Sequence, residues 1–411
     1  MTCPYCGYLC RDTDTICPVC KSILPPSDFR KNVIVSEKKN DKPSEASTQD
    51  TGVMVKSSNH FKKLFEIDNN TASIKSPDIS YDGDIADIFG RLKGFASSHG
   101  AVISDDDLRI LLSSVSAGRL VYCRDSEECR KAIELISRFF GNPHMTFLNK
   151  ENIVGGCNSI LGDWRVDENG EKYYKDTEFL AGIYTASMST VPYFIAAGGL
   201  SEPSKQQFSD FVRNYVRNPF SADVIKISNY QSISNKPKLF SYGQMIIPGN
   251  IFNVILIKSD EKLSDDAAFC YFPIIDVSAK LSGTHADDDG ALNISTMLFA
   301  KICGNAGKDN YISESVWKKI DDIEKFINDN AGSFCFDNRL LRNTERFSSV
   351  FIATGGSEAD AADCIFAFYI LPALRRTRPD FDAWKEKFAD ILIQKFSGIS
   401  TMARSKKFLK K

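Results

Sequence analysis

The pattern of apolar and polar residues indicates an ordered body that begins near residue 84. The segments "DIADIFGRLKGFASSHG" and "DDDLRILLSSVSAG" carry apolar residues at the three- and four-residue spacing of one helix face. Gly100 and Gly118 follow at positions where a helix can end. Acidic residues at the start of the second segment suit the positive end of a helix dipole. We therefore expect two amphipathic helices at the start of the body.

Short apolar runs alternate with amphipathic segments beyond this point. "RLVYC", "VPYFIAA" and "NIFNVILIK" are typical of buried strands, and "RDSEECRKAIELISRFFG" and "SKQQFSDFVRNYV" are typical of helices. In the first of these helices we expect Asp125 or Ser126 to be the N-cap, with Glu127 and Glu128 in the first turn. Buried strands that alternate with helices predict an α/β fold with a largely parallel sheet covered on both faces.

Residues 27–78 differ from the body, because they are rich in Ser, Lys, Asp and Thr and poor in large apolar residues. Such a segment cannot offset its ordering entropy by burial, so we expect a flexible linker. A short helix is expected within it at "NHFKKLFEI", where Phe61, Leu64 and Phe65 share a face. The linker would let the N-terminal residues search for a partner independently of the body.

The composition fits a protein that has a packed core and whose net charge does not attract a charged partner over a long distance. The chain has 411 residues, of which 43% are hydrophobic and 25% charged, and its formal net charge is -2. That balance provides no global field to attract nucleic acid or an anionic membrane. The sequence shows no apolar signal segment and no uninterrupted apolar run of about 18 residues, so we expect a cytoplasmic protein with no membrane contact.

Two cysteine pairs stand close together at the start of the chain, in "MTCPYCGYLCRDTDTICPVCKS". Cys3 and Cys6 form one C-P-x-C pair, and Cys17 and Cys20 form the other. Each pair can point two thiolates at one metal ion, so the two pairs supply the four ligands of a tetrahedral zinc site. The alternative is a pair of disulfides, which requires an oxidising compartment. Cys10 has no partner at C-x-x-C spacing and is interpreted as a spare thiol.

The first 26 residues resemble the short zinc ribbons that begin many bacterial proteins. Some such ribbons bind nucleic acid, and many bind protein. Here the basic residues are offset by acidic ones, so the stripe of positive charge that phosphate binding needs is missing. The basic residues are Arg11, Lys21, Arg30 and Lys31, and the acidic residues are Asp12, Asp14 and Asp28. Protein binding is therefore favoured over nucleic-acid binding.

The order of segments in the body carries a second resemblance. After the first strand and helix come "DTEFL", "QQFSDF", "IPGNIFNVILI", "DDAAFCYFPIIDV" and finally "AADCIFAFYILPAL". This series resembles the McrB-type AAA+ ATPases of modification-dependent restriction systems over residues 84–400. The resemblance implies a degenerate AAA+-like α/β domain over residues 79–290 and a helical lid over residues 291–411.

The residues that such ATPases use for chemistry are replaced in this chain. The segment "RDSEECRK" stands where a glycine-rich phosphate loop is expected. Arg130 stands near the position of the lysine that contacts the phosphates, and Lys131 stands at the position of the Ser or Thr whose hydroxyl binds magnesium. Ala197 and Gly198 stand where the family has an Asp-Glu pair that serves magnesium and the attacking water. Phe269, Cys270 and Tyr271 replace a run of arginines. Arg339 lies about where the lid of the family carries a phosphate-sensing arginine, and we expect it to be a surface residue.

These losses favour a non-catalytic, pseudo-ATPase interaction or scaffold subunit, with no catalytic or nucleotide-binding residues. The zinc ribbon would recruit a protein partner, in an AAA+ assembly of restriction or defence type. A nucleic-acid-binding regulator that uses the ribbon and the basic tail "MARSKKFLKK" is the alternative, and a divergent nucleotide-binding ATPase or GTPase is the third reading. We expect that tail to be a frayed helix with solvated lysines. Ser357, in "GGSEADAADC", is expected to cap a helix.

Overall fold

The computed structural model describes residues 60–70, 77–78, 80–142, 145–149, 159–217, 224–227, 236–258, 272–281, 290–331, 338–378 and 380–410. The predicted zinc ribbon at residues 1–26 lies outside these residues, as does most of the predicted linker. Among the described residues, no helix combines the length and the apolar character that crossing a bilayer requires.

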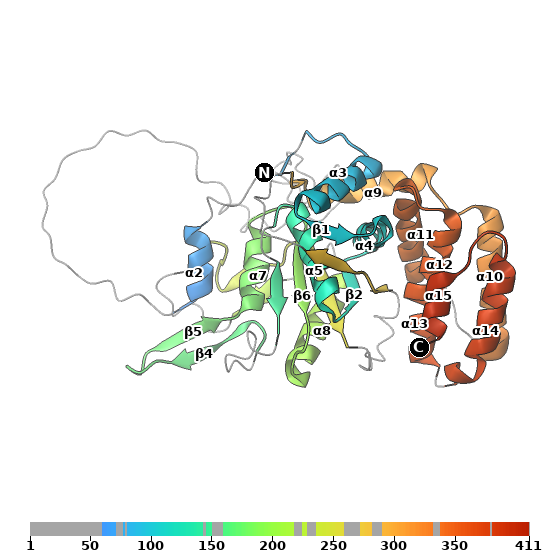
Figure 1. The fold of residues 1–411 in the computed structure, drawn as a ribbon. Helices are drawn as coiled ribbons and strands as arrows, with labels where there is room; N and C mark the ends of the chain where they lie inside the picture. Colours follow the sequence, from blue (N-terminus) through green and yellow to red (C-terminus); the bar gives the residue numbers. More distant parts are fainter. Residues whose placement is uncertain are drawn as a thin grey trace, which may run out of the picture.

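A five-stranded parallel sheet lies at the centre of the body (Figure 1). Its strands, in chain order, are β2 (Leu120–Arg124), β3 (Thr146–Leu148), β6 (Tyr193–Ala197), β9 (Ile251–Ile257) and β10 (Ile274–Ile275). In space their order is β10-β2-β9-β6-β3, and each neighbouring pair is parallel. The predicted parallel sheet is therefore confirmed.

The alternation of side chains along each strand gives the sheet two buried faces. On β2, Val121 and Cys123 contribute to one hydrophobic core, whereas Leu120 and Tyr122 contribute to the other. The first face is covered by α3 (Ile85–Ser98), α4 (Asp105–Ala117) and α5 (Glu127–Phe139). The second face is covered by α7 (Glu178–Ser187) and α8 (Glu202–Arg217). Both helices predicted at the start of the body are confirmed, as α3 and α4.

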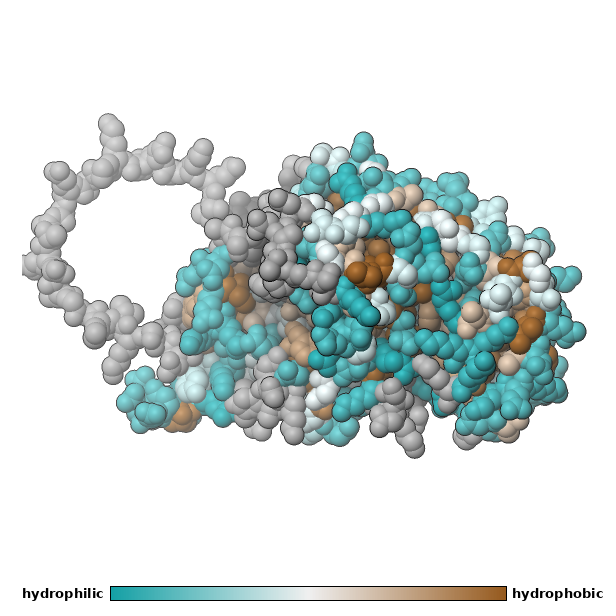
Figure 2. Space-filling view, in the orientation of Figure 1, coloured by the Kyte–Doolittle hydropathy of each residue, from teal (hydrophilic) through white to brown (hydrophobic). Residues whose placement is uncertain are grey.

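Among the described residues, three short antiparallel pairs lie outside the main sheet. They are β1 (Ala101–Ile103) with β11 (Ala279–Leu281), β4 (Gly162–Val166) with β5 (Lys172–Asp176), and β7 (Val224–Lys226) with β8 (Gln244–Ile246). The β4–β5 hairpin extends away from the main sheet (Figure 1). On the face visible in Figure 2, small apolar patches are scattered among hydrophilic residues, so the apolar side chains lie mainly in the cores.

The C-terminal helices are α9 (Thr296–Asp309), α10 (Glu314–Ala331), α11 (Asn338–Ala353), α12 (Glu358–Ile365), the π-helical turn η4 (Phe366–Ile370), α13 (Leu371–Thr377), α14 (Phe381–Phe396) and α15 (Ala403–Leu409). α10 and α14 share a third core, in which Ile323 and Phe388 are fully buried. α9 and α11 instead pack in the first core through Phe299 and Phe347. The segment predicted as a lid therefore contributes to the core of the sheet domain as well as to a core of its own.

The helix expected at "NHFKKLFEI" forms as α2 (Lys62–Asn69). Phe61 and Leu64 are fully buried in the second core, beside Tyr174 and Phe240. The predicted linker over 27–78 therefore includes a segment that belongs to the body. The burial of two large apolar side chains offsets the ordering entropy that the polar neighbouring residues cannot offset.

Candidate functional site

The strand order reverses at β2, so the carboxyl end of this strand is a candidate position for a ligand site. The chain leaves β2 for the opposite edge of the sheet and later crosses over β2 between β9 and β10. In open α/β sheets, ligands bind beyond the carboxyl ends of the strands at such a reversal. The turn from β2 to α5, residues 124–127, occupies this position.

Side chains of the chain itself occupy this turn. The backbone N–H of Asp125 donates to the carbonyl of Ile257, at the end of β9. The carboxylate of Asp125 accepts hydrogen bonds from Nε and Nη2 of Arg130, at 2.8 Å and 2.6 Å. The Arg130 guanidinium also lies over the ring of Phe147, 5.0 Å from its centroid. Arg130 is therefore held by its own chain, near the position that a phosphate-binding lysine would occupy.

The start of α5 is capped by a side chain of the chain itself. The Ser126 hydroxyl accepts the backbone N–H of Cys129, so the predicted N-cap is confirmed as Ser126. Glu127 and Glu128 follow in the first turn, as predicted. The hydrogen bond from Lys131 lowers the pKa of the Glu127 carboxyl, and this ion pair has an N–O distance of 2.6 Å. Two carboxylates at the helix start disfavour an anionic ligand there.

The neighbouring strand end is also bridged by ion pairs. Asp276 directly follows β10, and its carboxylate lies 3.5 Å from Nε of Arg124 at the end of β2. Lys407 of α15 approaches the same carboxylate at 3.8 Å. The carboxyl ends of β2 and β10 thus carry charges that are paired within the chain, so their charge is largely compensated without a ligand.

The end of β6 offers no carboxylate. Ala197 is the last residue of the strand and is paired with Leu148 and Ile255. Gly198 follows it, and a Cβ atom there would come within 3.0 Å of the Leu256 side chain. Glu202, the nearest acid along the chain, lies in the first turn of α8 with its side chain exposed. The structure places Ala197 and Gly198 at the strand end as the resemblance implies, and a side chain at Gly198 would require Leu256 to shift.

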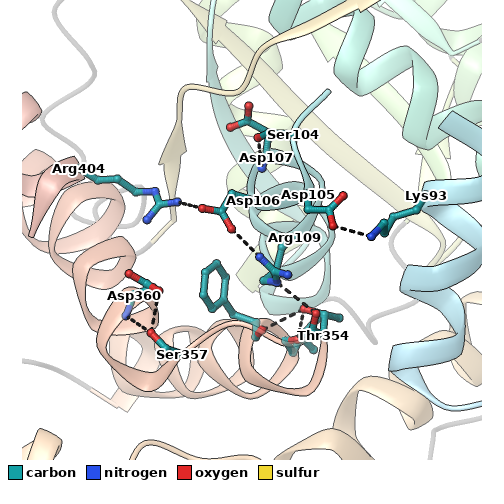
Figure 3. Close-up of polar contacts among 12 residues, drawn as sticks. Lys93, Ser104, Asp105, Asp106, Asp107, Arg109, Thr354, Ser357, Asp360 and Arg404 are labelled. Atoms are coloured by element: carbon teal, nitrogen blue, oxygen red, sulfur yellow. Dashed lines mark hydrogen bonds and ion pairs between the residues drawn. The ribbon is translucent and has the colours of Figure 1, made fainter. Parts of the chain in front are cut away.

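A polar network joins α4 to the C-terminal helices (Figure 3). The carboxylate of Asp106 accepts from Nη1 of Arg109 at 2.6 Å and from Nη2 of Arg404 at 2.9 Å. Nε of Arg109 donates to the carbonyl of Thr354 at 3.2 Å. Burial raises the pKa of the adjacent Asp107 carboxyl, against the hydrogen bond with Ser104. The network fixes α11 and α15 to α4.

The C-terminal helix α15 is docked, so the prediction of a frayed tail is wrong. Met402 precedes it in a left-handed conformation and provides no side-chain cap. Asp363 of α12, which is 1% exposed, caps the helix instead. Its carboxylate accepts the backbone N–H groups of Arg404 and Ser405, both at 2.9 Å, and the Ser405 hydroxyl at 2.6 Å. The sequence pattern missed this cap because the two partners lie 42 residues apart.

Buried carboxylates also hold α2 at both ends. Asp176, at the end of β5, accepts the backbone N–H of Leu64, and Asp68 accepts from the Tyr184 hydroxyl and the backbone N–H of Lys238. Burial raises the pKa of Asp176 to about 6, because desolvation outweighs the hydrogen bond from Leu64. α2 is thereby anchored to the body at both ends.

Several predicted site residues fall outside the described residues. These are the zinc ligands Cys3, Cys6, Cys17 and Cys20, and the replaced arginine positions Phe269, Cys270 and Tyr271. Arg339 falls in the first turn of α11, and its side chain is not described. Within the described ranges, no group of three or more His, Cys, Asp or Glu side chains is arranged to hold a metal ion. Cys123, Cys129, Cys303 and Cys364 are buried.

Comparison with known proteins yields a broad structural similarity and no sequence relative. No protein-family model matches the chain, and no curated protein matches its sequence. Among solved structures, it is similar to an inferred ATPase from Cytophaga hutchinsonii, at 11% identity and a TM-score of 0.36, over 85% of this chain and 98% of the other. At this score and identity, the similarity identifies neither a family nor an activity.

Proposed function

We propose that this chain is a non-catalytic AAA+-like subunit, a pseudo-ATPase whose body serves as an assembly platform. The turn from β2 to α5 supports this proposal most directly. At the sheet position where a triphosphate would bind, Asp125 pairs with Arg130, and the start of α5 carries Glu127 and Glu128. A phosphate would have to break the ion pair between Asp125 and Arg130 and would lie close to the carboxylates of Glu127 and Glu128.

The connection between sheet and lid supports the same function. In an active AAA+ protein, bound nucleotide links the sheet domain, the lid and a neighbouring subunit. Here α4 is linked to α11 through Arg109 and Thr354, and to α15 through Asp106 and Arg404. These contacts hold the sheet domain and the C-terminal helices together without nucleotide.

The N-terminal cysteines supply the second part of the proposal. Cys3, Cys6, Cys17 and Cys20 would bind one zinc ion, and the resulting ribbon would recruit a protein partner in the cytoplasm. By the resemblance to McrB-type proteins, the complex would belong to a restriction or defence assembly. The basic tail gives little support to nucleic-acid binding, because Arg404 and Lys407 of α15 are already paired with Asp106 and Asp276.

A phosphate-release assay tests the catalytic part of the proposal. Purified protein with magnesium and ATP or GTP is expected to release no more phosphate than the buffer alone, and an active AAA+ ATPase serves as the positive control. Release that grows with protein concentration would contradict the proposal. Affinity purification from the native cell, with and without residues 1–26, tests recruitment: partners that depend on the ribbon are expected only with the full chain.

A further inference from the structure

The helices α13 and α15 share a surface on which positive charge is in excess. Residues 371–378 and 400–411 contain eight basic residues and no acidic one. The guanidinium of Arg375 in α13 lies over the ring of Phe408 in α15, 5.8 Å from its centroid, so the two helices lie side by side. Arg375 is exposed and contacts no carboxylate in the part of the chain that the structure describes. We call the surface that carries Arg375, Arg404 and Lys407 the basic face.

The carboxylates next to the basic face do not neutralise it, because each is shared between two cations. Asp106 pairs with Arg109 and Arg404 at 2.6 Å and 2.9 Å, and Asp276 pairs with Arg124 and Lys407 at 3.5 Å and 3.8 Å. The Lys407 side chain is also 70% exposed. Positive charge therefore remains available to an acidic partner on this surface.

The β4–β5 hairpin ends in a turn of the opposite charge. The carboxylate of Asp167 accepts the backbone N–H groups of Asn169 and Glu171, at 2.9 Å and 2.8 Å. These hydrogen bonds give the turn a defined shape. Residues 167–172 hold three carboxylates and one lysine, and the side chains of Glu168 and Glu171 are exposed. The tip of the hairpin thus presents negative charge in a fixed arrangement.

The hairpin tip lies far from the basic face of its own chain. In Figure 1 the hairpin and the helices α13 and α15 lie on opposite sides of the sheet domain. Each of the two surfaces also has an apolar part: Val166 beside the tip is 61% exposed, and Phe408 is only partly buried. The two surfaces are therefore complementary in charge and in apolar character, and only separate copies of the chain can bring them together.

We propose that the hairpin tip of one copy docks on the basic face of a second copy. Glu168 and Glu171 would face Arg375 and Lys407, which steers and orients the contact, and Val166 would cover part of the Phe408 ring. Because every copy carries both surfaces, the contact repeats head to tail. The inference rests on the proposed role of the body as an assembly platform, but it does not depend on nucleotide.

Sedimentation velocity of the full chain, over a range of protein concentrations, tests this contact. The average mass is expected to rise with concentration and to fall at high salt, because salt screens exposed charges. A hairpin variant, with Glu168→Lys and Glu171→Lys, should self-associate more weakly by about tenfold or more, since like charges then face each other. A face variant, with Arg375→Glu and Lys407→Glu, should show the same loss. If the face variant does not fold, Arg375→Gln replaces it and should weaken association in the same direction.

A mixture of the two variants gives the sharpest result. The reversed hairpin of one variant meets the reversed face of the other, so the mixture should associate although neither variant does so alone. Lys318→Glu with Lys325→Glu, on the exposed side of α10, is the control and should associate like the unmodified chain.

Two results would overturn the inference. The first is an unmodified chain that stays monomeric, or a mixture that does not associate; neither affects the phosphate-release assay, which tests the pseudo-ATPase proposal separately. The second is salt-sensitive binding of a single-stranded oligonucleotide that is lost in the face variant, which would assign the basic face to nucleic acid instead.

Discussion

The Nε atom of Arg109 in α4 donates a hydrogen bond to the carbonyl oxygen of Thr354, which directly follows α11. The two residues are 245 positions apart in the sequence. The same guanidinium lies between the rings of Phe89 and Phe351, 5.2 Å and 5.5 Å from their centroids. One side chain thus joins the first helices of the body to the C-terminal helices, through a hydrogen bond and through packing.

Arg109→Ala is expected to lower the free energy of unfolding by about 1–3 kcal/mol, because it leaves the Thr354 carbonyl and part of the Asp106 carboxylate without partners. Urea unfolding measures the change. Lys93→Ala is the control, since it breaks the exposed pair with Asp105 in the same region (Figure 3) and should cost less than about 1 kcal/mol. Equal effects of the two substitutions would contradict the role given to Arg109.

Asp363→Ala is expected to release α15. The substitution removes the acceptor for two backbone N–H groups and for the Ser405 hydroxyl. Amide hydrogen exchange over residues 403–409 should become faster, and the unfolding free energy should fall by about 1–3 kcal/mol. Lys410→Ala, at the exposed end of the same segment, should leave exchange unchanged. Unaltered exchange in Asp363→Ala would show that α15 is held by other contacts.

The attachment of α2 should depend on pH through Asp176. Its folded-state pKa, about 6, is raised above the ordinary value of 3.8 by burial, so the folded protein binds this proton more tightly than the unfolded chain does. The contribution of Asp176 to stability is therefore largest below about pH 4 and declines as the pH rises to about 6, by roughly 2–3 kcal/mol. Above that range it stays constant.

The comparison with Asp176→Asn isolates this contribution. Asparagine can still accept the N–H of Leu64 but does not titrate, so the stability difference between the two proteins should change between pH 4 and 6 and then level off. His60 titrates in the opposite sense, because burial lowers its pKa, and its effect is common to both proteins. A difference that is independent of pH would contradict the raised pKa of Asp176.

The zinc ribbon yields a prediction of its own. The full chain should contain about one zinc ion by elemental analysis, and replacing Cys3 and Cys6 by Ser should remove it. Removal of residues 1–26 should leave the unfolding transition of the body in place, since the described cores are built from residues 61–409. Less than about one zinc per chain, or a body that fails to fold without the ribbon, would contradict this account.

Local sequence patterns predicted the elements whose partners are close in the chain. The apolar spacing of α3 and α4, the strands β2, β6 and β9, and the caps Ser126 and Ser357 all follow from a few neighbouring residues. The docking of α2 and α15 could not be predicted in this way. It depends on Asp176 and Asp363, carboxylates that lie 112 and 42 residues from the N–H groups they accept. Polar flanking residues around both helices pointed to disorder, and only the fold brings these carboxylates to them.

The candidate site could be predicted in part. The missing glycines of "RDSEECRK" are visible in the sequence, as is the absence of a carboxylate at Ala197 and Gly198. Arg130 and Asp125 are five residues apart, so their pairing can also be inferred from the local sequence. The ion pairs that Asp276 forms with Arg124 and Lys407 required the structure, because they join β2, β10 and the C-terminal helix.

The response of the melting temperature to nucleotide shows whether the turn after β2 binds a triphosphate. The full chain is unfolded with magnesium, with and without millimolar ATP or GTP. No change in melting temperature is expected. A nucleotide bound at 100 times its dissociation constant would add about 2.7 kcal/mol to the unfolding free energy. A saturable rise that is abolished by Arg130→Ala would show that the turn after β2 binds nucleotide, and would contradict the account.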